Sequence, residues 1–262
     1  MSEIDARAVV APTTRLGRGV RIGAFAVVGD EVELGDACVL HPHAAVRGPA
    51  RMGQGNVVHP FCSVGGDPQD LTYGGERTEL VVGDENVFHE FVTVNRGTAK
   101  GGGVTRIGSH NLFMAYTHVA HDCAVGDYTV FTNGATLAGH ATVEDWAVIG
   151  AFSAVHQFCR VGKYSYIAGY TVITQDVAPF SKVAAPRETK CYGVNSIGLE
   201  RRGFSGERIK AIEQAFRLLL RSKLNTSQAI ERMKASASGG NGSVDVEELI
   251  RFIETAERGL TK

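Results

Sequence analysis

An apolar residue recurs at every sixth position along two long runs of the chain, and this period constrains the fold more than any other sequence feature. One run extends from Ile4 to Val64, and the other extends from Ile107 to Ile173. A helix repeats every 3.6 residues and a plain strand every two, so neither produces a period of six. A short strand followed by a corner does, and three such hexads make one triangular coil of about 18 residues. The repeat therefore predicts a parallel β-helix.

The other positions of the hexad are biased as well. The residue four places after each anchor is usually small, as at Ala44 and Ala135, and we expect it to point into the coil. Glycine often follows the anchor directly, as at Gly17 and Gly35, and we interpret it as supplying positive φ at a recurring turn. Four cysteines share the small position and are interpreted as buried hydrophobic residues rather than disulfide or zinc-binding residues: Cys38, Cys62, Cys123 and Cys159.

The composition excludes several classes of partner. The net charge of −1 gives no electrostatic reason to expect a polyanion, so nucleic-acid binding is not predicted. The N-terminus lacks the basic segment and apolar run of a signal peptide. No stretch reaches the roughly 18 apolar residues that a transmembrane helix needs. We therefore expect a soluble, cytoplasmic protein that does not insert into membranes.

Two segments interrupt the hexads. A turn-rich segment near residues 66–79 follows the first run, and a second segment near residues 96–105 contains three consecutive glycines. Long loops that project from a compact fold tend to carry function. The glycine triplet lacks the Lys-Ser/Thr of a phosphate-binding P-loop, so we interpret it as a flexible loop tip.

The uninterrupted repeat over residues 107–178 allows spatial neighbours to be predicted. Residues 18 apart should stack on adjacent coils, about 4.8 Å from each other. This register places His121, Gly139, Gln157 and Gln175 in one column.

The neighbouring columns add further polar side chains. Asp122 and His140 stack next to this column, His118 lies just before the same corner, and His156 adjoins Gln157. The sequence thus predicts a polar cluster along one edge of three consecutive coils. A polar ladder that only stabilises the solenoid corner is the alternative.

Such a cluster suits proton transfer from a hydroxyl. Histidine titrates near neutral pH, and a neutral imidazole can take a proton from a hydroxyl as it attacks an acyl carbon. We predict that His121 is this base, with Asp122 or a nearby carbonyl fixing its tautomer. The N–H of Gly139 could reach a developing oxyanion. Cys123 and Cys159 are expected to point inward, which favours direct transfer over a covalent acyl-enzyme.

A metal site is the alternative chemistry for the same histidines. Three imidazoles can bind zinc, and His118 and His121, helped by His89, would then form the site of a metal-dependent hydratase. That arrangement requires the three rings to converge. The column of Gly139 and Gln157 offers no reason for a metal, so no metal is expected.

The hexads resemble the left-handed hexapeptide-repeat family, and the order of the polar motifs resembles the UDP-N-acetylglucosamine acyltransferases that begin lipid A biosynthesis. The resemblance spans essentially the whole chain. It implies a left-handed β-helix over residues 1–190 and a helical domain over residues 191–262. The motifs that carry it lie at residues 68–71, 96–98, 118–123, 135–140, 154–159, 193–195 and 201–205.

This resemblance implies a homotrimer with active sites between subunits. It implies acyl carrier protein as the donor of a 3-hydroxyacyl chain and the glucosamine 3-hydroxyl of UDP-N-acetylglucosamine as the acceptor. The phosphopantetheine-linked chain is then a substrate, and no cofactor is implied. His121 matches the general base, Asp122 the residue that orients it, and Gly139 the oxyanion donor. The matching substrate-binding positions are Asp70, His118, His140, His156, Gln157, Gly169, Asn195, Arg201 and Arg202.

Some of these matches imply specific contacts, and two positions depart from the family pattern. Gly169 matches a position whose size limits the acyl groove, while Asn195 and the two arginines match positions near the uridine diphosphate. The family often has Lys and Glu where this chain has Thr72 and Ile197, and each replacement removes a polar contact. An amino-sugar acceptor or a coenzyme A donor is the alternative within the same fold.

The hexads end after Pro179, and helical periodicity follows. We predict a short helix at 195–202, a helix capped by Ser205, a helix capped by Thr226, a loop around 239–242 and a last amphipathic helix through 246–256. Basic residues on the outer faces of these helices are either solvated or steer an acidic carrier protein: Lys210, Arg217, Arg221 and Lys223.

Overall fold

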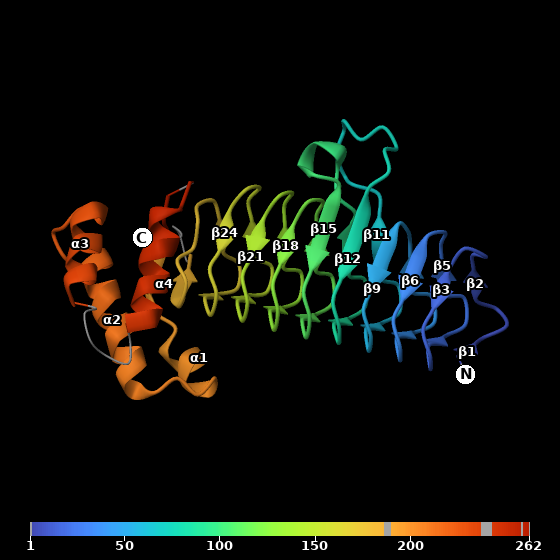
Figure 1. The fold of residues 1–262 in the computed structure, drawn as a ribbon, viewed down its shortest axis with the longest axis horizontal. Helices are drawn as coiled ribbons and strands as arrows, with labels where there is room; N and C mark the ends of the chain where they lie inside the picture. Colours follow the sequence, from blue (N-terminus) through green and yellow to red (C-terminus); the bar gives the residue numbers. More distant parts are fainter. Residues whose placement is uncertain (1, 186–189, 237–242, 258, 262) are drawn as a thin grey trace.

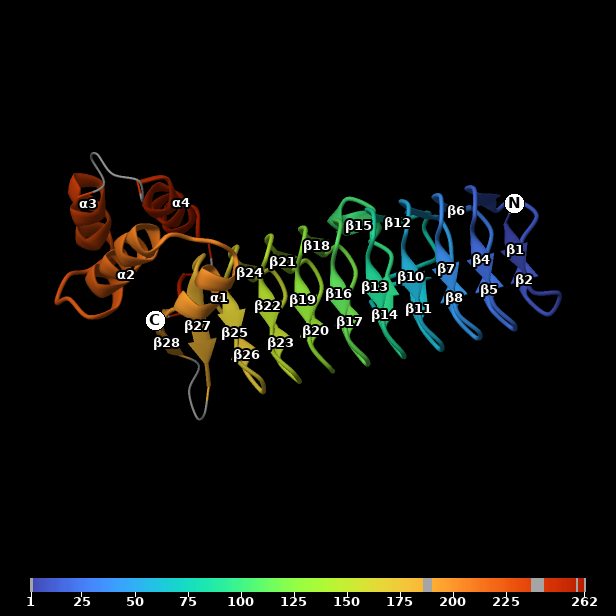
Figure 2. The same ribbon diagram turned by 90° about the horizontal axis from the view of Figure 1, so that it is seen from below.

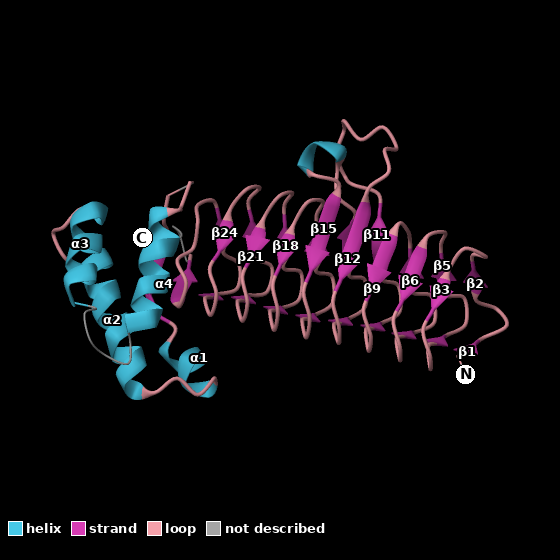
Figure 3. Ribbon diagram, in the orientation of Figure 1, coloured by secondary structure: helices cyan, strands magenta, loops and turns pink. Residues whose placement is uncertain are grey.

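The computed structural model describes residues 2–185, 190–236, 243–257 and 259–261. Short parallel strands coil into a long three-sided solenoid, and a group of helices follows at its C-terminal end (Figure 1). The colouring by secondary structure separates the two parts clearly (Figure 3). The predicted parallel β-helix with C-terminal helices is confirmed.

Each side of the solenoid is one sheet. The first sheet contains β1 (Glu3–Ile4), β4 (Arg21–Ile22), β7 (Val39–Leu40), β10 (Val57–Val58), β13 (Val87–Phe88), β16 (Leu112–Phe113), β19 (Val130–Phe131), β22 (Val148–Ile149), β25 (Tyr166–Ile167), β27 (Ser181–Ala184) and β28 (Lys190–Val194). The second contains β2 (Val9–Val10), β5 (Val27–Val28), β8 (Ala45–Val46), β11 (Ser63–Gly66), β14 (Thr93–Asn95), β17 (His118–Val119), β20 (Thr136–Leu137), β23 (Ala154–Val155) and β26 (Val172–Ile173). The third contains β3 (Arg15–Leu16), β6 (Val32–Leu34), β9 (Ala50–Met52), β12 (Glu79–Val82), β15 (Val104–Ile107), β18 (Ala124–Val125), β21 (Thr142–Val143) and β24 (Arg160–Val161).

The strands pair in the predicted register. Along the second sheet His118 pairs with Thr136, which is one coil of 18 residues further on. The two insertions lengthen their coils, so Ser63 pairs with Thr93 and Thr93 pairs with His118. The last coil is shorter than predicted, because Val161 bridges to Val177, which is 16 residues further on.

The hexad anchors form the core inside the coils. Anchors from all three sheets are fully or almost fully buried in one continuous cluster. Phe88, Phe113 and Phe131 stack on successive coils, with ring centroids 4.9 Å apart at both steps. The four cysteines predicted to point inward are buried, which confirms that prediction.

Most glycines that follow the anchors have a different role from the one predicted, although Gly65 does have positive φ. Gly17 and Gly35 do not have positive φ; instead a Cβ at either position would lie 2.5 Å from backbone atoms of the next coil. Their lack of a side chain therefore lets neighbouring coils approach. Positive φ falls on bulky residues at the corners, such as Phe61 and Trp146, which stack on aromatic neighbours.

The helices pack around a second hydrophobic cluster. They are α1 (Ser196–Arg201), α2 (Gly206–Leu220), α3 (Thr226–Ser236) and α4 (Ser243–Glu254). The Ser205 hydroxyl caps α2 by accepting from the Arg208 N–H, as predicted. The cap of α3 was predicted one residue late, because Asn225 Oδ1 accepts from the Gln228 N–H and Thr226 is already helical. The predicted loop at 239–242 lies outside the described residues.

The two parts of the chain meet at the last strand. β28 pairs antiparallel with β27 and contacts α2, and the predicted division after residue 190 falls within β28, so that division stays a prediction. The view in Figure 2 shows the helices gathered beyond β25 and β27, at the opposite end from the N-terminus. No helix among the described residues is long and apolar enough to cross a membrane.

The phenylalanine stack provides a test of the core. We expect Phe113→Ala to lower the free energy of unfolding by about 3–5 kcal/mol, because it removes a fully buried ring between two others. The matched control is Phe61→Ala, which removes a half-exposed corner ring and should cost much less. Urea denaturation followed by circular dichroism measures both variants, and equal losses would contradict the assignment of the core.

Candidate functional site

The predicted base lies at the corner between the second and third sheets, which we call the catalytic corner. β17 ends at Val119, and His121 and Asp122 follow in the turn before β18. His121 Nδ1 lies 2.8 Å from Asp122 Oδ2, and the exposed fractions of the two side chains are 14% and 1%. This geometry is that of a hydrogen bond in which the imidazole donates from Nδ1 and its Nε2 remains available as an acceptor.

Asp122 is held by the second insertion. Its carboxylate accepts from the Thr98 N–H at 2.8 Å and from the Thr98 hydroxyl at 2.7 Å. Its own N–H donates to the Thr105 hydroxyl at 2.8 Å. Thr98 also caps the 3-10 helix η1 (Ala99–Gly101). The segment that leads into the glycine triplet therefore folds against the Asp122 carboxylate, a contact that the loop-tip prediction did not include.

Gly139 lies directly against the His121 ring, one coil further along the solenoid. A Cβ at this position would be 2.5 Å from His121 Cε1 and 2.8 Å from Nε2, so the close approach requires glycine. Among the described residues, no carbonyl or side chain accepts a hydrogen bond from the Gly139 N–H. The predicted column of His121 and Gly139 thus places a free backbone donor beside the free nitrogen of the imidazole.

His140 and Gln157 complete the catalytic corner. The His140 ring meets His121 edge-on, with centroids 5.3 Å apart and planes at 88°. It stacks on Phe158 at 4.5 Å, and its Nε2 lies 3.7 Å from Asp122 Oδ2. Gln157 is exposed one coil beyond Gly139. These residues therefore lie at one edge of the solenoid, as the 18-residue register predicted.

His118 and His156 lie at the margins of the cluster. His118 Nδ1 is 2.8 Å from the Thr93 hydroxyl, and burial, with the nearby His121, lowers the pKa of His118. His156 is exposed, and its Nδ1 lies 3.1 Å from the Gln157 carbonyl oxygen. The predicted convergence holds closely for His121, Asp122 and His140 and loosely for the other two histidines.

Asp70 reaches the catalytic corner from the first insertion. Its Oδ1 accepts from the Thr72 N–H at 2.7 Å and from the Thr72 hydroxyl at 2.9 Å. These hydrogen bonds lower the pKa of Asp70, and the nearby His121 and Lys100 lower it further. The two insertions project from the same side of the solenoid, beside β11, β12 and β15 (Figure 1).

Arg96 fixes the first insertion to the solenoid, a role that the sequence did not suggest. Its side chain is almost fully buried and donates to the Gly65 carbonyl, to the Asp67 carboxylate and to the Tyr73 hydroxyl. The neighbouring Asn95 donates to the Asp67 carbonyl at 2.8 Å. The available signal was the Arg-Gly-Thr motif at residues 96–98, to which no role had been given.

The remaining predicted residues lie at other corners of the same chain. Asn195 precedes α1 and donates to the Tyr164 carbonyl at 3.3 Å. Arg202 follows α1 with its guanidinium 5.4 Å from the Trp146 ring centroid, and burial lowers the pKa of Arg202. Trp146 and Tyr164 form the corner between the third and first sheets. These residues therefore do not join His121 within one chain.

Arg201 and Gly169 are likewise separate from the catalytic corner. Arg201 ends α1 and is exposed. Ile197, which stands where the family often has Glu, is exposed on the same short helix. Gly169 follows β25 at the corner between the first and second sheets, where a Cβ would lie 3.2 Å from the Ala151 carbonyl oxygen. Gly169 is exposed at this corner.

The histidines do not assemble in the way that the metal hypothesis requires. His89 lies at the corner between the first and second sheets, stacked on His59 at 4.5 Å, and not with His118 and His121. Among the described residues, two groups do place three ligand atoms within 4.8 Å of one another: His121, Asp122 and His140, and His59, His89 and Glu90. The rings of His59 and His89 are only 18° from parallel, so their lone pairs do not converge on one ion.

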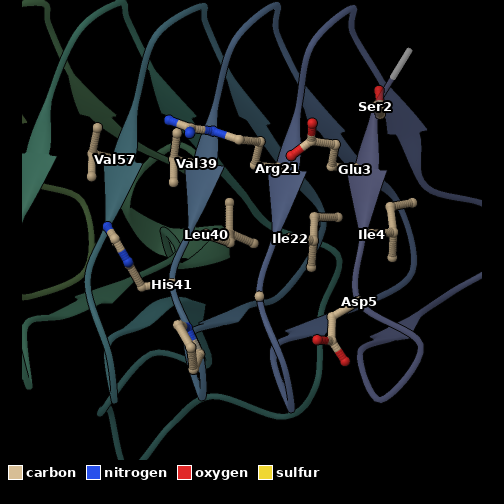
Figure 4. Close-up of a pocket in the computed structure, with 12 residues that line it drawn as sticks. Ser2, Glu3, Ile4, Asp5, Arg21, Ile22, Val39, Leu40, His41 and Val57 are labelled. Carbon is tan, nitrogen blue, oxygen red and sulfur yellow. The ribbon is translucent and has the colours of Figure 1, made fainter.

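A hollow on the outer face of the first sheet lies at the other end of the solenoid. Figure 4 shows it lined by outward side chains of the first coils, among them Glu3, Arg21, Val39 and His41. The neighbouring strands present these side chains in rows, and they do not converge on one point. Nothing in this hollow resembles the acid–base arrangement of the catalytic corner.

Comparison with known proteins gives concordant results. A family profile described as UDP N-acetylglucosamine O-acyltransferase, domain 2, matches residues 176–261. The chain is similar to the acyl-[acyl-carrier-protein]–UDP-N-acetylglucosamine O-acyltransferase of Alkalilimnicola ehrlichii, with 52% identity over 262 residues and complete coverage of both chains. The chain is 50% identical to the protein of the same name from Xylella fastidiosa over 261 residues, which cover 100% of this chain and 98% of the relative.

Solved structures give the same result. The UDP-N-acetylglucosamine acyltransferase of Francisella novicida matches with a TM-score of 0.94 and 36% identity, covering 98% of this chain and 93% of that chain. The UDP-N-acetylglucosamine O-acyltransferase of Moraxella catarrhalis also matches with a TM-score of 0.94 and 36% identity, over 99% of each chain. Since these matches extend over the whole solenoid, the predicted left-handed β-helix is confirmed with them.

The surroundings of His118 predict a pH-dependent stability. Its pKa in the folded protein lies below the ordinary 6.5, so below about pH 6.5 the unfolded chain binds a proton that the folded chain does not. Stability should therefore fall as the pH falls below about 6.5, and His118→Gln should lose this part of the decline. Thermal unfolding of both proteins between pH 8 and pH 5 measures the difference. Parallel curves for the two proteins would contradict the neutral, buried state of His118.

Proposed function

The chain belongs to the UDP-N-acetylglucosamine O-acyltransferase family, and we propose that His121 is the general base of its acyl transfer. The reaction moves an acyl chain from acyl carrier protein to UDP-N-acetylglucosamine and is the first step of lipid A biosynthesis. The observation that carries the proposal is the 2.8 Å contact between His121 Nδ1 and Asp122, which leaves Nε2 free beside Gly139.

The proposed step is a direct transfer. His121 Nε2 accepts the proton of the glucosamine 3-hydroxyl while the hydroxyl oxygen attacks the thioester carbonyl of a 3-hydroxyacyl chain. The C–S bond of the tetrahedral intermediate then breaks, and the imidazolium returns the proton to the leaving sulfur. Asp122 keeps the imidazole in the required tautomer and stabilises its charged form. The phosphopantetheine-linked chain is a substrate in this scheme, and no further cofactor or metal takes part.

Gly139 supplies the proposed oxyanion donor. Its N–H has no acceptor among the described residues, and it lies beside the ring that receives the proton. A backbone donor directed at a developing oxyanion typically contributes a few kcal/mol to transition-state stabilisation.

A covalent acyl-enzyme is disfavoured by the state of the cysteines. Cys123 adjoins Asp122 in sequence but points into the coil, and burial raises the pKa of Cys123 to about 12. Cys159 is fully buried as well. A thiol of this kind has almost no thiolate at neutral pH, so the hydroxyl of the acceptor is the better nucleophile.

We propose that the site is completed between subunits of a homotrimer. His121 lies at one corner of the solenoid, whereas Gly169 and the arginines at the end of α1 lie away from it, so a second chain would be needed to bring them together. The second sheet, which leads to the catalytic corner, is flanked near its end by exposed apolar side chains that a neighbour would cover. These are Phe152, Phe158, Tyr170 and Val172.

Substrate contacts follow from this arrangement. Asp70, His118, His140, His156 and Gln157 surround the sugar and the acyl thioester at the catalytic corner. Asn195, Arg201 and Arg202 of a neighbouring subunit contact the uridine diphosphate, since guanidinium groups suit phosphate geometry. We place the reaction in the cytoplasm. The exposed Lys210, Arg217, Arg221 and Lys223 of the helical domain are proposed to attract the acidic carrier protein.

The proposed base is tested by transfer assays. Wild-type protein should form the 3-O-acyl product from UDP-N-acetylglucosamine and a 3-hydroxyacyl carrier protein, and the corresponding coenzyme A thioester should be a poor donor. His121→Ala should lower kcat by about 10²- to 10⁴-fold, the range for loss of a general base. Mass spectrometry of the product measures both effects.

The control for this assay is the assembly state. His121→Ala should stay folded and keep the size of the wild type, because the ring lies outside the hydrophobic core. A folded His121→Ala protein with near-normal kcat would remove His121 from the base role. Transfer to a 3-amino sugar but not to the 3-hydroxyl would instead support the alternative acceptor.

The position of Gly169 predicts control of acyl chain length. Gly169→Met should lower kcat/KM for the longest accepted chain by at least about tenfold relative to a chain several carbons shorter, because it fills space in the proposed groove. Gly169→Ala is the matched control, since its Cβ needs only a small shift of Ala151. A chain-length profile that both variants share with the wild type would show that Gly169 does not line the groove.

A further inference from the structure

The tips of the two insertions meet through one lysine. Lys100 lies on η1, and its Nζ donates to the Thr72 hydroxyl at 3.0 Å. Among the residues that the structure describes, Lys100 has no carboxylate within ion-pair distance. The hydrogen bond to the Thr72 hydroxyl therefore positions the Lys100 ammonium next to the turn that carries Asp70.

This contact determines which groups donate and which accept the hydrogen bonds of the Asp70 turn. An ammonium group is only a donor, so the Thr72 hydroxyl oxygen must accept from Lys100. The single hydroxyl proton of Thr72 is then committed to Asp70 Oδ1, which lies 2.9 Å away and also accepts from the Thr72 N–H. No described residue donates to Asp70 Oδ2, so this oxygen remains an open acceptor.

The other side of the contact is tied to the catalytic pair. η1 begins after Thr98, which donates twice to the Asp122 carboxylate. The backbone of Gly101 lies against the same carboxylate, since a Cβ there would be 2.1 Å from Asp122 Cγ. Lys100 lies between Thr98 and Gly101 in the sequence. A continuous series of contacts therefore runs from His121 through Asp122, η1 and Lys100 to the Asp70 turn.

We propose that Lys100 is a positioning residue for the acceptor substrate, which acts through Thr72 on Asp70. Lys100 holds the Asp70 turn at a fixed place relative to His121, so that Asp70 Oδ2 accepts a hydrogen bond from a hydroxyl of the acceptor's sugar. This inference rests on the proposed function, in which Asp70 contacts the sugar while His121 deprotonates its reacting hydroxyl.

A direct contact between Lys100 and a substrate phosphate is the competing role. The charges around the ammonium argue against it, because the carboxylates of Asp70 and Glu76 both interact with Lys100. A phosphate bound here would be attracted by one ammonium group but repelled by two carboxylates. A neutral sugar hydroxyl meets no such repulsion and needs the acceptor that Asp70 Oδ2 offers.

A double-mutant cycle separates the two roles. Lys100→Met should raise the KM for UDP-N-acetylglucosamine about three- to tenfold, which is the range for one hydrogen bond, and leave kcat and the KM for acyl carrier protein within about twofold. Thr72→Val should give the same result. Asp70→Asn should raise the same KM at least as much. Lys100→Met should then add nothing in the Asp70→Asn background, because Lys100 acts through Asp70.

Two further variants control the cycle. Lys100→Arg keeps the charge and the donor and should recover most of the acceptor affinity. Lys234→Met removes a surface ammonium in the helical domain, where it pairs with Glu254, and should leave both KM values unchanged. Thermal unfolding of each variant verifies that it is folded.

Several results would overturn the inference. An unchanged acceptor KM in Lys100→Met, with a raised KM in Asp70→Asn, would refute the role of Lys100 while leaving the proposed function intact. Full additivity of the two substitutions would show a direct contact of Lys100 with substrate. An unchanged KM in Asp70→Asn would refute the proposed Asp70 contact itself, and loss of acyl-carrier-protein affinity alone would assign Lys100 to the donor.

Discussion

The in-register stacking of coils is the constraint on which the rest of the structure depends. Each strand contributes only a few backbone hydrogen bonds, but the same register is repeated along all three sheets. A residue's position in the hexad therefore decides whether its side chain enters the core, and its coil decides its neighbours. The catalytic corner uses this rule directly, because Gly139 lies against His121 only through the 18-residue register that pairs β17 with β20.

Regular stacking alone would leave His121 on an open edge, and the two insertions change that. The second insertion gives Thr98 to the Asp122 carboxylate, and the first brings the Asp70 turn to the same corner. Arg96, buried at the base of both insertions, fixes the first to the solenoid. The solenoid thus supplies the regular spacing, and the irregular segments supply the side chains that surround His121 and Asp122.

The sequence predicted the coils and the clustering of the polar side chains well, because the six-residue period gives each residue a defined position on the solenoid. His121, Gly139 and His140 could be placed next to one another without any coordinates. The register carries no information where it is interrupted, so the support of Asp122 by Thr98 and the burial of Arg96 were missed. The role of the glycines was also misjudged, because the close approach of coils at Gly17 depends on packing that a single hexad does not reveal. Residues at different corners, such as Gly169 and Arg202, match one site only if a second chain is considered.

The most direct test of the account is the structure of the protein with bound UDP-N-acetylglucosamine. The distance to be measured joins the glucosamine 3-hydroxyl oxygen and His121 Nε2. The account predicts a hydrogen-bonding distance of about 2.6–3.2 Å, with the nucleotide held by the α1 arginines of an adjacent subunit. A sugar whose 3-hydroxyl faces another group, or a nucleotide bound wholly within one chain away from His121, would contradict it.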